Sequence, residues 1–238
     1  MVRSSDFDVV KLQLTAFTPH SSQFNASTFL THVLGKHKAR YSGNLRVMPL
    51  PPEVSAQVPH VELGSASDGW VLHGSPGRID SYWYAVDSTP PLSEIVVDCA
   101  SPLLDYLTEV KPRLGRFGFV INRACKTDHP AAELVNRFCS EAARNPDSPE
   151  APLRNSRSFQ IHNLKRYSSP IDGIEINSWV RCLAGPAGDE EAGIVVEQDI
   201  NTPQEELGAR AFSIEEAASF FPMALGEAQS VLSKYFPE

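Results

Sequence analysis

The stretch DVVKLQLTAF, residues 8–17, alternates apolar and polar side chains. Leu12 and Leu14 fall on one side of an extended chain, whereas Lys11 and Gln13 fall on the other. An alternation with a period of two residues predicts a β-strand with one buried face. Strands of this kind form antiparallel sheets that bury one face under helices.

A second strand of the same kind, RFGFVINR, is predicted at residues 116–123. After each of these two strands the pattern predicts a short helix, several extended segments and a long helix. Asn25 is a good N-cap for the first short helix, and Ser213 with Glu216 forms a capping box for the last long one. The predicted strands are 8–17, 44–50, 58–64, 69–74, 78–86, 116–123, 157–167, 173–184 and 192–200, and the predicted helices are 25–35, 91–110, 130–143 and 213–235.

The order of elements therefore predicts an α+β fold in which a β-α-β-β-β-α unit occurs twice. The first unit covers residues 1–112 and the second 113–238, with one continuous domain as the alternative. Pro102 and Pro222 interrupt the two long helices and are expected to kink them. Joined edge to edge, the units would form a curved, mainly antiparallel sheet covered by both helices. The TATA-binding-protein and helix-grip folds have a similar plan, and this analogy carries no function.

The composition is that of a globular protein, with 42% hydrophobic and 21% charged residues. No apolar run has the length of a membrane span, and residues 1–6 do not open a secretory signal, so we expect a cytoplasmic protein without membrane contact. The net charge is −8, and residues 187–238 alone hold 11 acids and two bases. Residues 1–186 are therefore near neutral, which disfavours a broad nucleic-acid surface.

The sequence contains none of the common motifs for catalysis or cofactor binding. Its four cysteines are far apart, which disfavours a zinc site and a dense disulfide scaffold. There is no phosphate-binding loop, dinucleotide fingerprint or nucleophile elbow. We therefore expect no metal or cofactor, and an enzyme is less favoured than a binding protein. The cysteines are Cys99, Cys125, Cys139 and Cys182.

One region resembles a sporadically distributed family of uncharacterised bacterial proteins of about 250 residues. In that family a P-x-x-Q-x-P stretch precedes a short strand, a DG turn and an R-x-D strand; here four residues separate Pro52 from Gln57. The resemblance implies a bacterial protein of accessory character and suggests a mobile-element or antiviral-defence context. Its residues are Leu50-Pro51-Pro52-Glu53, Gln57-Val58-Pro59-His60-Val61-Glu62-Leu63, Asp68-Gly69-Trp70-Val71-Leu72 and Pro76-Gly77-Arg78-Ile79-Asp80.

Two groups of side chains are candidates for binding a protein partner. Arg78, Asp80 and Tyr82 are spaced two apart and share one face of a strand. The favoured interpretation of these three residues is an ordinary solvated face. Trp179 and Arg181 share a face of the strand 173–184 in the same way, and an exposed aromatic beside an arginine is typical of binding anchors. Their alternative interpretation is a helix-covered tryptophan in the core.

Basic residues suggest a second function, nucleic-acid binding, through the stretches 36–46 and 111–126. Ordinary solvated surface is the favoured interpretation of both stretches, and core packing is favoured for the aromatic residues between the bases. The candidate residues are Lys36, Lys38, Arg40, Arg113, Arg116, Arg123 and Lys126.

His73 and Asp80 suggest a third function, an enzyme with an acid–base site, although no nucleophile is placed beside them. The favoured hypothesis is a non-enzymatic binding or accessory subunit that holds a protein partner on a face or groove of the sheet. The product of a neighbouring gene is a natural partner, and a homodimer is an alternative.

Overall fold

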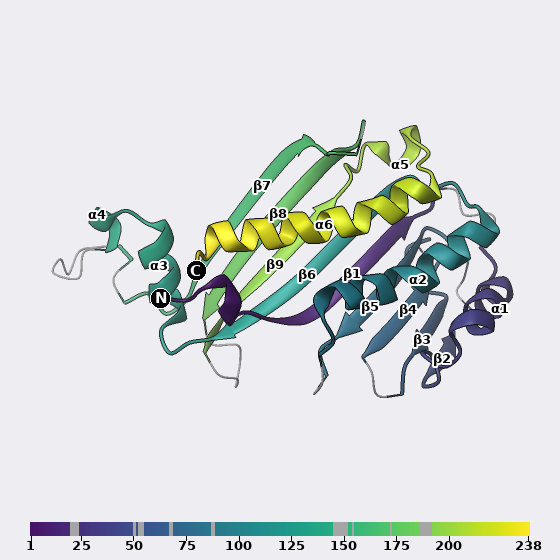
Figure 1. The fold of residues 1–238 in the computed structure, drawn as a ribbon, viewed down its shortest axis with the longest axis horizontal. Helices are drawn as coiled ribbons and strands as arrows, with labels where there is room; N and C mark the ends of the chain where they lie inside the picture. The colour runs from purple at the N-terminus through teal and green to yellow at the C-terminus, as the bar shows by residue number, and fades with distance from the viewer. Residues whose placement is uncertain are drawn as a thin grey trace.

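A computed structural model describes residues 1–19, 24–49, 51, 55–66, 69–86, 89–144, 152–153, 155–171, 173–185 and 192–238. Asp68 of the predicted DG turn lies outside these residues. Within them the protein is a mixed α+β structure built on one large antiparallel sheet (Figure 1).

The sheet has nine strands in the described ranges, in the order β2-β3-β4-β5-β1-β6-β9-β8-β7, and every neighbouring pair is antiparallel. β1 and β6 therefore lie beside each other at the centre. All nine predicted strands are confirmed, and β6 extends three residues beyond its predicted end. The bounds are β1 Asp8–Phe17, β2 Leu45–Val47, β3 Val61–Gly64, β4 Trp70–Gly74, β5 Arg78–Tyr84, β6 Arg116–Lys126, β7 Phe159–Ser168, β8 Glu175–Gly185 and β9 Gly193–Asn201.

Three of the four predicted helices are confirmed as continuous helices, with Asn25 and Ser213 capping as expected. The predicted helix 130–143 is wrong as one element, because Cys139 is extended and divides it. Ser140 follows, and serine favours caps over helix interiors. The α-helices are α1 Ala26–His37, α2 Leu92–Val110, α3 Pro130–Phe138, α4 Glu141–Arg144, α5 Glu206–Ala209 and α6 Ile214–Tyr235, with a 3₁₀ turn at Ser4–Asp6.

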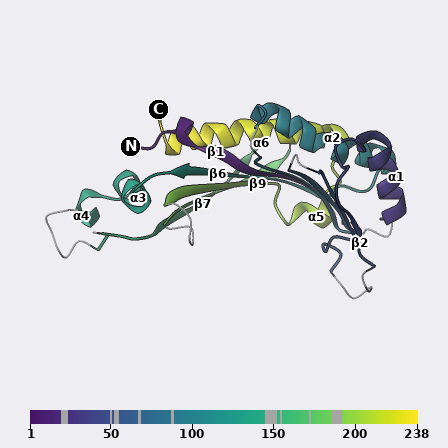
Figure 2. The ribbon, with the colours of Figure 1, turned by 90° about the horizontal axis from the view of Figure 1, so that it is seen from below.

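The three longest helices, α1, α2 and α6, all lie on the same side of the sheet (Figure 2). α2 and α6 contact each other above β1 and β6. The sheet curves away from them, so its opposite face is concave and carries none of these helices (Figure 2). The expectation of a curved antiparallel sheet with both long helices on one side is confirmed.

The hydrophobic core lies between the helices and the sheet. Leu12 and Leu14 of β1 and Phe117 and Phe119 of β6 are completely buried there. The phenylalanines are therefore core residues, as favoured, and they cannot serve as stacking platforms for bases. A second cluster packs α3 and the end of α6 against β8 and β9. No helix of the described residues is long and apolar enough to span a bilayer.

Candidate binding face

The side of the sheet away from α2 and α6 is the candidate site, and we call it the open face. Its side chains alternate along each strand with the buried residues of the core. Because register aligns residues across neighbouring strands, these side chains form rows that cross the sheet. On the six strands β4, β5, β1, β6, β9 and β8 they include Val71, His73, Arg78, Asp80, Tyr82, Tyr84, Lys11, Gln13, Thr15, Phe17, Arg116, Val120, Asn122, Glu197, Asp199, Asn201, Asn177, Trp179, Arg181 and Leu183.

One row joins the two groups of residues predicted as partner-binding. Tyr82 lies opposite Gln13, Gln13 opposite Val120, Val120 opposite Asp199, and Asp199 opposite Trp179. Adjacent strands are about 4.8 Å apart, so Tyr82 and Trp179 are separated by about 19 Å across the sheet. Segments far apart in the sequence thus place two aromatic side chains on one side of the sheet, Trp179 half-buried and Tyr82 only 7% exposed.

Asp80 is the centre of the first group, which we call the Asp80 cluster. It is only 1% exposed although it lies on the open face. Its Oδ2 lies 2.7 Å from Nε of Arg78, and its Oδ1 accepts hydrogen bonds from Oγ1 of Thr15 at 2.7 Å and Nε2 of Gln13 at 3.1 Å. Both oxygens of this buried carboxylate are therefore satisfied, as a buried charge requires. The interpretation of Arg78 and Asp80 as a freely solvated pair is wrong, because neighbouring side chains cover Asp80.

His73 and two tyrosines surround the Asp80 cluster. His73 lies opposite Asp80, and its Nε2 is 3.6 Å from a carboxylate oxygen of Glu62. Burial lowers the pKa of His73, although Glu62 and Asp80 act to raise it. Burial also raises the pKa of Tyr82, whose ring stacks on Tyr84 at 6.1 Å. The His73 ring also packs edge to face against the Tyr82 ring, with centroids 5.0 Å apart.

Trp179 is the centre of the second group, which we call the Trp179 cluster. Trp179 is half-buried and points away from the helices, so it is not the helix-covered core residue of the alternative interpretation. The Arg181 guanidinium lies 5.7 Å from its ring centroid and pairs with Glu197 at 2.5 Å. The aromatic ring and its arginine are thus held in place by the next strand, β9.

Asp199 lies in register with Trp179 and was not among the predicted site residues. Burial raises its pKa, while Arg116 and a hydrogen bond from Nδ2 of Asn201 at 2.7 Å oppose the shift. No ion pair to Asp199 occurs among the described residues. The sequence contained a signal for this position. Every second residue of the strand faces the core, namely Ile194, Val196, Gln198 and Ile200. Asp199 therefore falls on the opposite side of the strand.

The basic residues of the nucleic-acid hypothesis do not share one surface. Lys36 pairs with Asp105 at 3.0 Å, and Arg40 pairs with Asp98 on the helix side of the molecule. Arg113 donates a hydrogen bond to the carbonyl of Gly208. Lys38 and Lys126 are exposed at different ends of the chain's fold, at α1 and at the end of β6.

The two arginines of β6 lie on opposite faces of the sheet. Arg116 is on the open face, where Nε donates to the carbonyl of Thr202 at 2.9 Å. Arg123 is 3% exposed beneath α6 and donates to Gln198, and burial lowers its pKa to about 10. The prediction that Arg123 contacts phosphate is therefore wrong, because the odd number of residues from Arg116 turns it toward the core.

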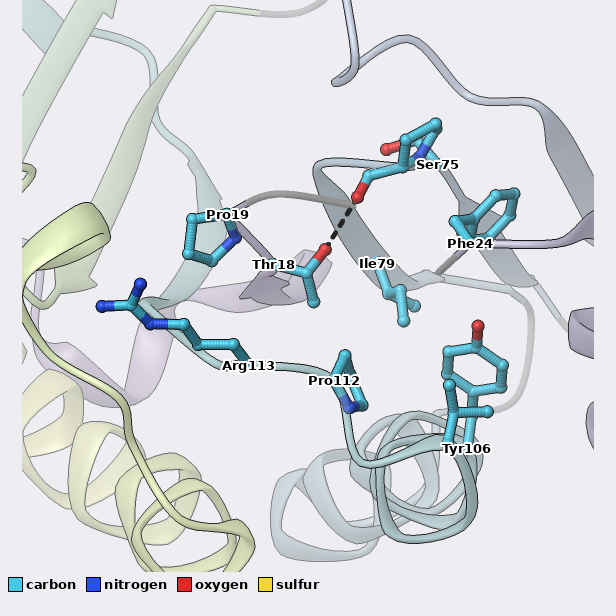
Figure 3. Close-up of a pocket in the computed structure, with 10 residues that line it drawn as sticks. Thr18, Pro19, Phe24, Ser75, Ile79, Tyr106, Pro112 and Arg113 are labelled. Carbon is cyan, nitrogen blue, oxygen red and sulfur yellow. Dashed lines mark hydrogen bonds between the residues drawn. The ribbon is translucent and has the colours of Figure 1, made fainter. Parts of the chain in front are cut away.

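A small cavity lies on the other side of the sheet, at the ends of β1, β4 and α2 (Figure 3). The centre of a water molecule can occupy about 30 Å³ of it, which suits one or two waters. Thr18, Ile79 and Tyr106 line it, and the Thr18 hydroxyl donates to the carbonyl of Pro76 at 3.0 Å. Because Ile79 precedes Asp80 in β5, this cavity and the Asp80 cluster face opposite ways.

These features define a class of protein, an antiparallel sheet with its three longest helices on one face and an open, concave second face. No group of three or more potential metal ligands occurs within the described residues. In comparisons with known proteins, no family model matches the chain, and no curated protein matches its sequence. The function must therefore be argued from the open face itself.

Proposed function

We propose that this protein is a non-enzymatic binding subunit that holds a protein partner on the open face of its sheet. The supporting observation is that one register row joins Tyr82 to Trp179 across five strands. Trp179 is half-buried beside Arg181, and tryptophan and arginine are among the residues that most often anchor protein interfaces. The product of a neighbouring gene is the first partner to test.

We further propose that the fold arose from an internal duplication with units 1–112 and 113–238. In each unit the first strand pairs with the last, since β1 pairs with β5 and β6 with β9. The first strands of the two units also pair with each other. An experimental structure in which β1, β5 and α2 fail to superimpose on β6, β9 and α6 would contradict the duplication.

The charges of the open face indicate what the partner presents. Arg78 pairs with Asp80 and Arg181 with Glu197, so these groups need no partner to neutralise them. Asp199 differs, because its carboxylate is desolvated and has no ion pair in the described structure. A lysine or arginine of the partner, placed beside Trp179, would pair with Asp199 and stack on the ring. Nucleic acid is disfavoured, because its phosphates would meet this carboxylate.

The test is affinity purification of tagged protein from its own cells, comparing wild type with Trp179→Ala and with the matched control Val97→Ala. Val97 is 64% exposed on the outer side of α2, away from the open face. We expect the same partner with wild type and Val97→Ala, and at least a tenfold loss of partner with Trp179→Ala. Thermal unfolding of the purified variants establishes that both remain folded.

Two results would overturn the proposal. One is a partner that is retained by Trp179→Ala and also by Gly118→Glu, which adds a charged side chain at the middle of the open face. The other is a monomer with no partner at micromolar concentration in light scattering.

A further inference from the structure

The second feature of interest is the free edge of the sheet at β7, which we call the β7 edge. β7 pairs with β8 over ten consecutive residues without a register shift. No other described strand pairs with it, and no described element lies beyond it in Figure 1. Within the described residues, its outward backbone N–H and C=O groups therefore form a row of hydrogen-bonding positions that no other strand uses.

The two edges of the sheet differ in how they are protected. The opposite edge, β2, is only three residues long, which limits strand addition. β7 has ten residues and contains neither proline nor glycine. Its adjacent Lys165 and Arg166 are both exposed, although Arg166 pairs with Glu205 at 3.3 Å. Charge is the common device that protects a long edge.

The β7 edge is basic within an acidic protein. β7 contains two bases, Lys165 and Arg166, and no acid, although the whole chain has a net charge of −8. Antiparallel pairing of β7 with a second copy would set one basic edge against another, and like charges on neighbouring strands are destabilising. Charge complementarity therefore favours an acidic strand over a second copy of this chain.

Apolar side chains accompany the basic ones along the edge. Leu164 of β7 and Leu183 of β8 are 45% and 41% exposed on the open-face side. Ile161 and Tyr167 are half-buried on the other side of the same strand. An added strand could thus place apolar residues against these groups and acidic residues near Lys165, as strand-adding peptides do.

We propose that the β7 edge binds an acidic, extended peptide segment as a tenth strand of the sheet. This inference goes beyond the proposed function, because it concerns the edge and does not require a partner on the open face. The proposal requires hydrogen bonds between the peptide backbone and β7, whereas general attraction of anions to a basic surface does not. An acidic segment with alternating apolar and acidic residues meets both the charge and the shape of the edge.

The probe is a capped ten-residue peptide that alternates valine and glutamate. We expect it to bind the full-length protein and to protect every second backbone amide of β7 from hydrogen exchange, because only alternate amides point outward. Lys165→Glu should weaken binding about three- to tenfold. Lys38→Glu is the matched control, with the same charge change on α1, and should leave binding unchanged.

Three control ligands make the inference falsifiable. Peptides with lysine in place of glutamate, or with two adjacent central prolines in the same acidic sequence, should not bind. Equal binding of the proline peptide would overturn strand addition, since its backbone donors are interrupted. The protein could instead bind a single-stranded oligonucleotide but not the valine–glutamate peptide, and lose that binding in Lys165→Glu. This result would overturn the acidic peptide as the ligand of the β7 edge in favour of nucleic acid. A dimer that depends on β7 would overturn the acidic peptide as the ligand of the edge in favour of a second copy of this chain.

Discussion

The two faces of the sheet are stabilised by different kinds of side-chain contact. On the covered face Phe117 packs against Phe220 and Phe221 beneath α6, with ring centroids 5.5 and 6.3 Å apart. On the open face Asp80 is equally buried, yet it is held by an arginine and two hydrogen-bond donors. The covered face gains stability from apolar burial, whereas the open face depends on ion pairs and hydrogen bonds between its polar side chains.

This difference separates residues that stabilise from residues that are available for binding. Paired groups such as Arg78 and Asp80 already have partners and have little left to offer a ligand. Trp179 and Asp199 are half-buried, and Asp199 has no ion pair within the described part of the chain. Side chains that depart from local satisfaction are expected at functional sites.

The largest effect is expected on the covered face of β6. Phe117→Ala should lower the free energy of unfolding by about 3–5 kcal/mol, because it leaves a cavity in the packed core. Val120→Ala, three residues along on the open face, should cost roughly 1 kcal/mol or less. Denaturant unfolding measures both. Equal losses would show that the two faces are equally packed.

The Asp80 cluster should rank second. Asp80→Asn removes a buried charge from Arg78 and disturbs two hydrogen bonds, and we expect a loss of about 2 kcal/mol. The value is below that of a fully buried ion pair because Arg78 remains partly solvated. A double-mutant cycle with Thr15→Val should show coupling between the two sites. Additive effects would contradict the contact.

His73 should make stability depend on pH. Burial lowers its folded-state pKa below the unfolded value of about 6.5, so its contribution is complete above that pH. The contribution is lost as the pH falls from about 6.5 through the folded-state pKa, because the unfolded state binds the proton more tightly. Unfolding curves between pH 7.5 and 5 should show this slope, and His73→Gln should reduce it. An unchanged slope in the variant would contradict the assignment.

Asp199 should have the smallest effect on stability, and its pH dependence should have the opposite sign to that of His73. Its raised folded-state pKa means that its contribution is present below about pH 4 and lost as the pH rises through the folded-state value. At neutral pH the charged carboxylate therefore costs stability, and Asp199→Asn should raise the free energy of unfolding by roughly 0.5 kcal/mol or less.

Asp199→Asn should also weaken binding of the partner protein, since it removes the carboxylate proposed to bind a cation. Greater stability together with weaker binding would mark Asp199 as a binding residue. A variant that loses stability would assign the carboxylate to the scaffold.

The fold was largely predictable, because period-two and helical patterns identify which residues face a core. The alternation in residues 8–17 and 173–184 predicted β1 and β8 within two residues at each end. The break at Cys139 was missed, since one extended residue leaves the helical spacing of its neighbours unchanged. α5 was also missed, because four residues carry too little periodicity to identify a helix.

The candidate site was only partly predictable. Spacing placed Arg78 with Asp80 and Trp179 with Arg181, each pair on one face of its own strand. Both pairs lie on the same side of one sheet because of the strand order, in which β1 pairs with β6. The spacing within each strand does not reveal this order. The basic stretch 111–126 was grouped by sequence proximity, although a strand turns Arg116 and Arg123 to opposite sides.

The most direct test of the central claim is site-specific photo-crosslinking in the protein's own cells. A photoreactive side chain replaces Val120, at the middle of the register row between Tyr82 and Trp179, or Val97, on the outer side of α2. We predict a crosslinked partner protein from position 120 and none from position 97. Crosslinking from position 97 alone would place the partner on the helices and contradict a binding role for the open face.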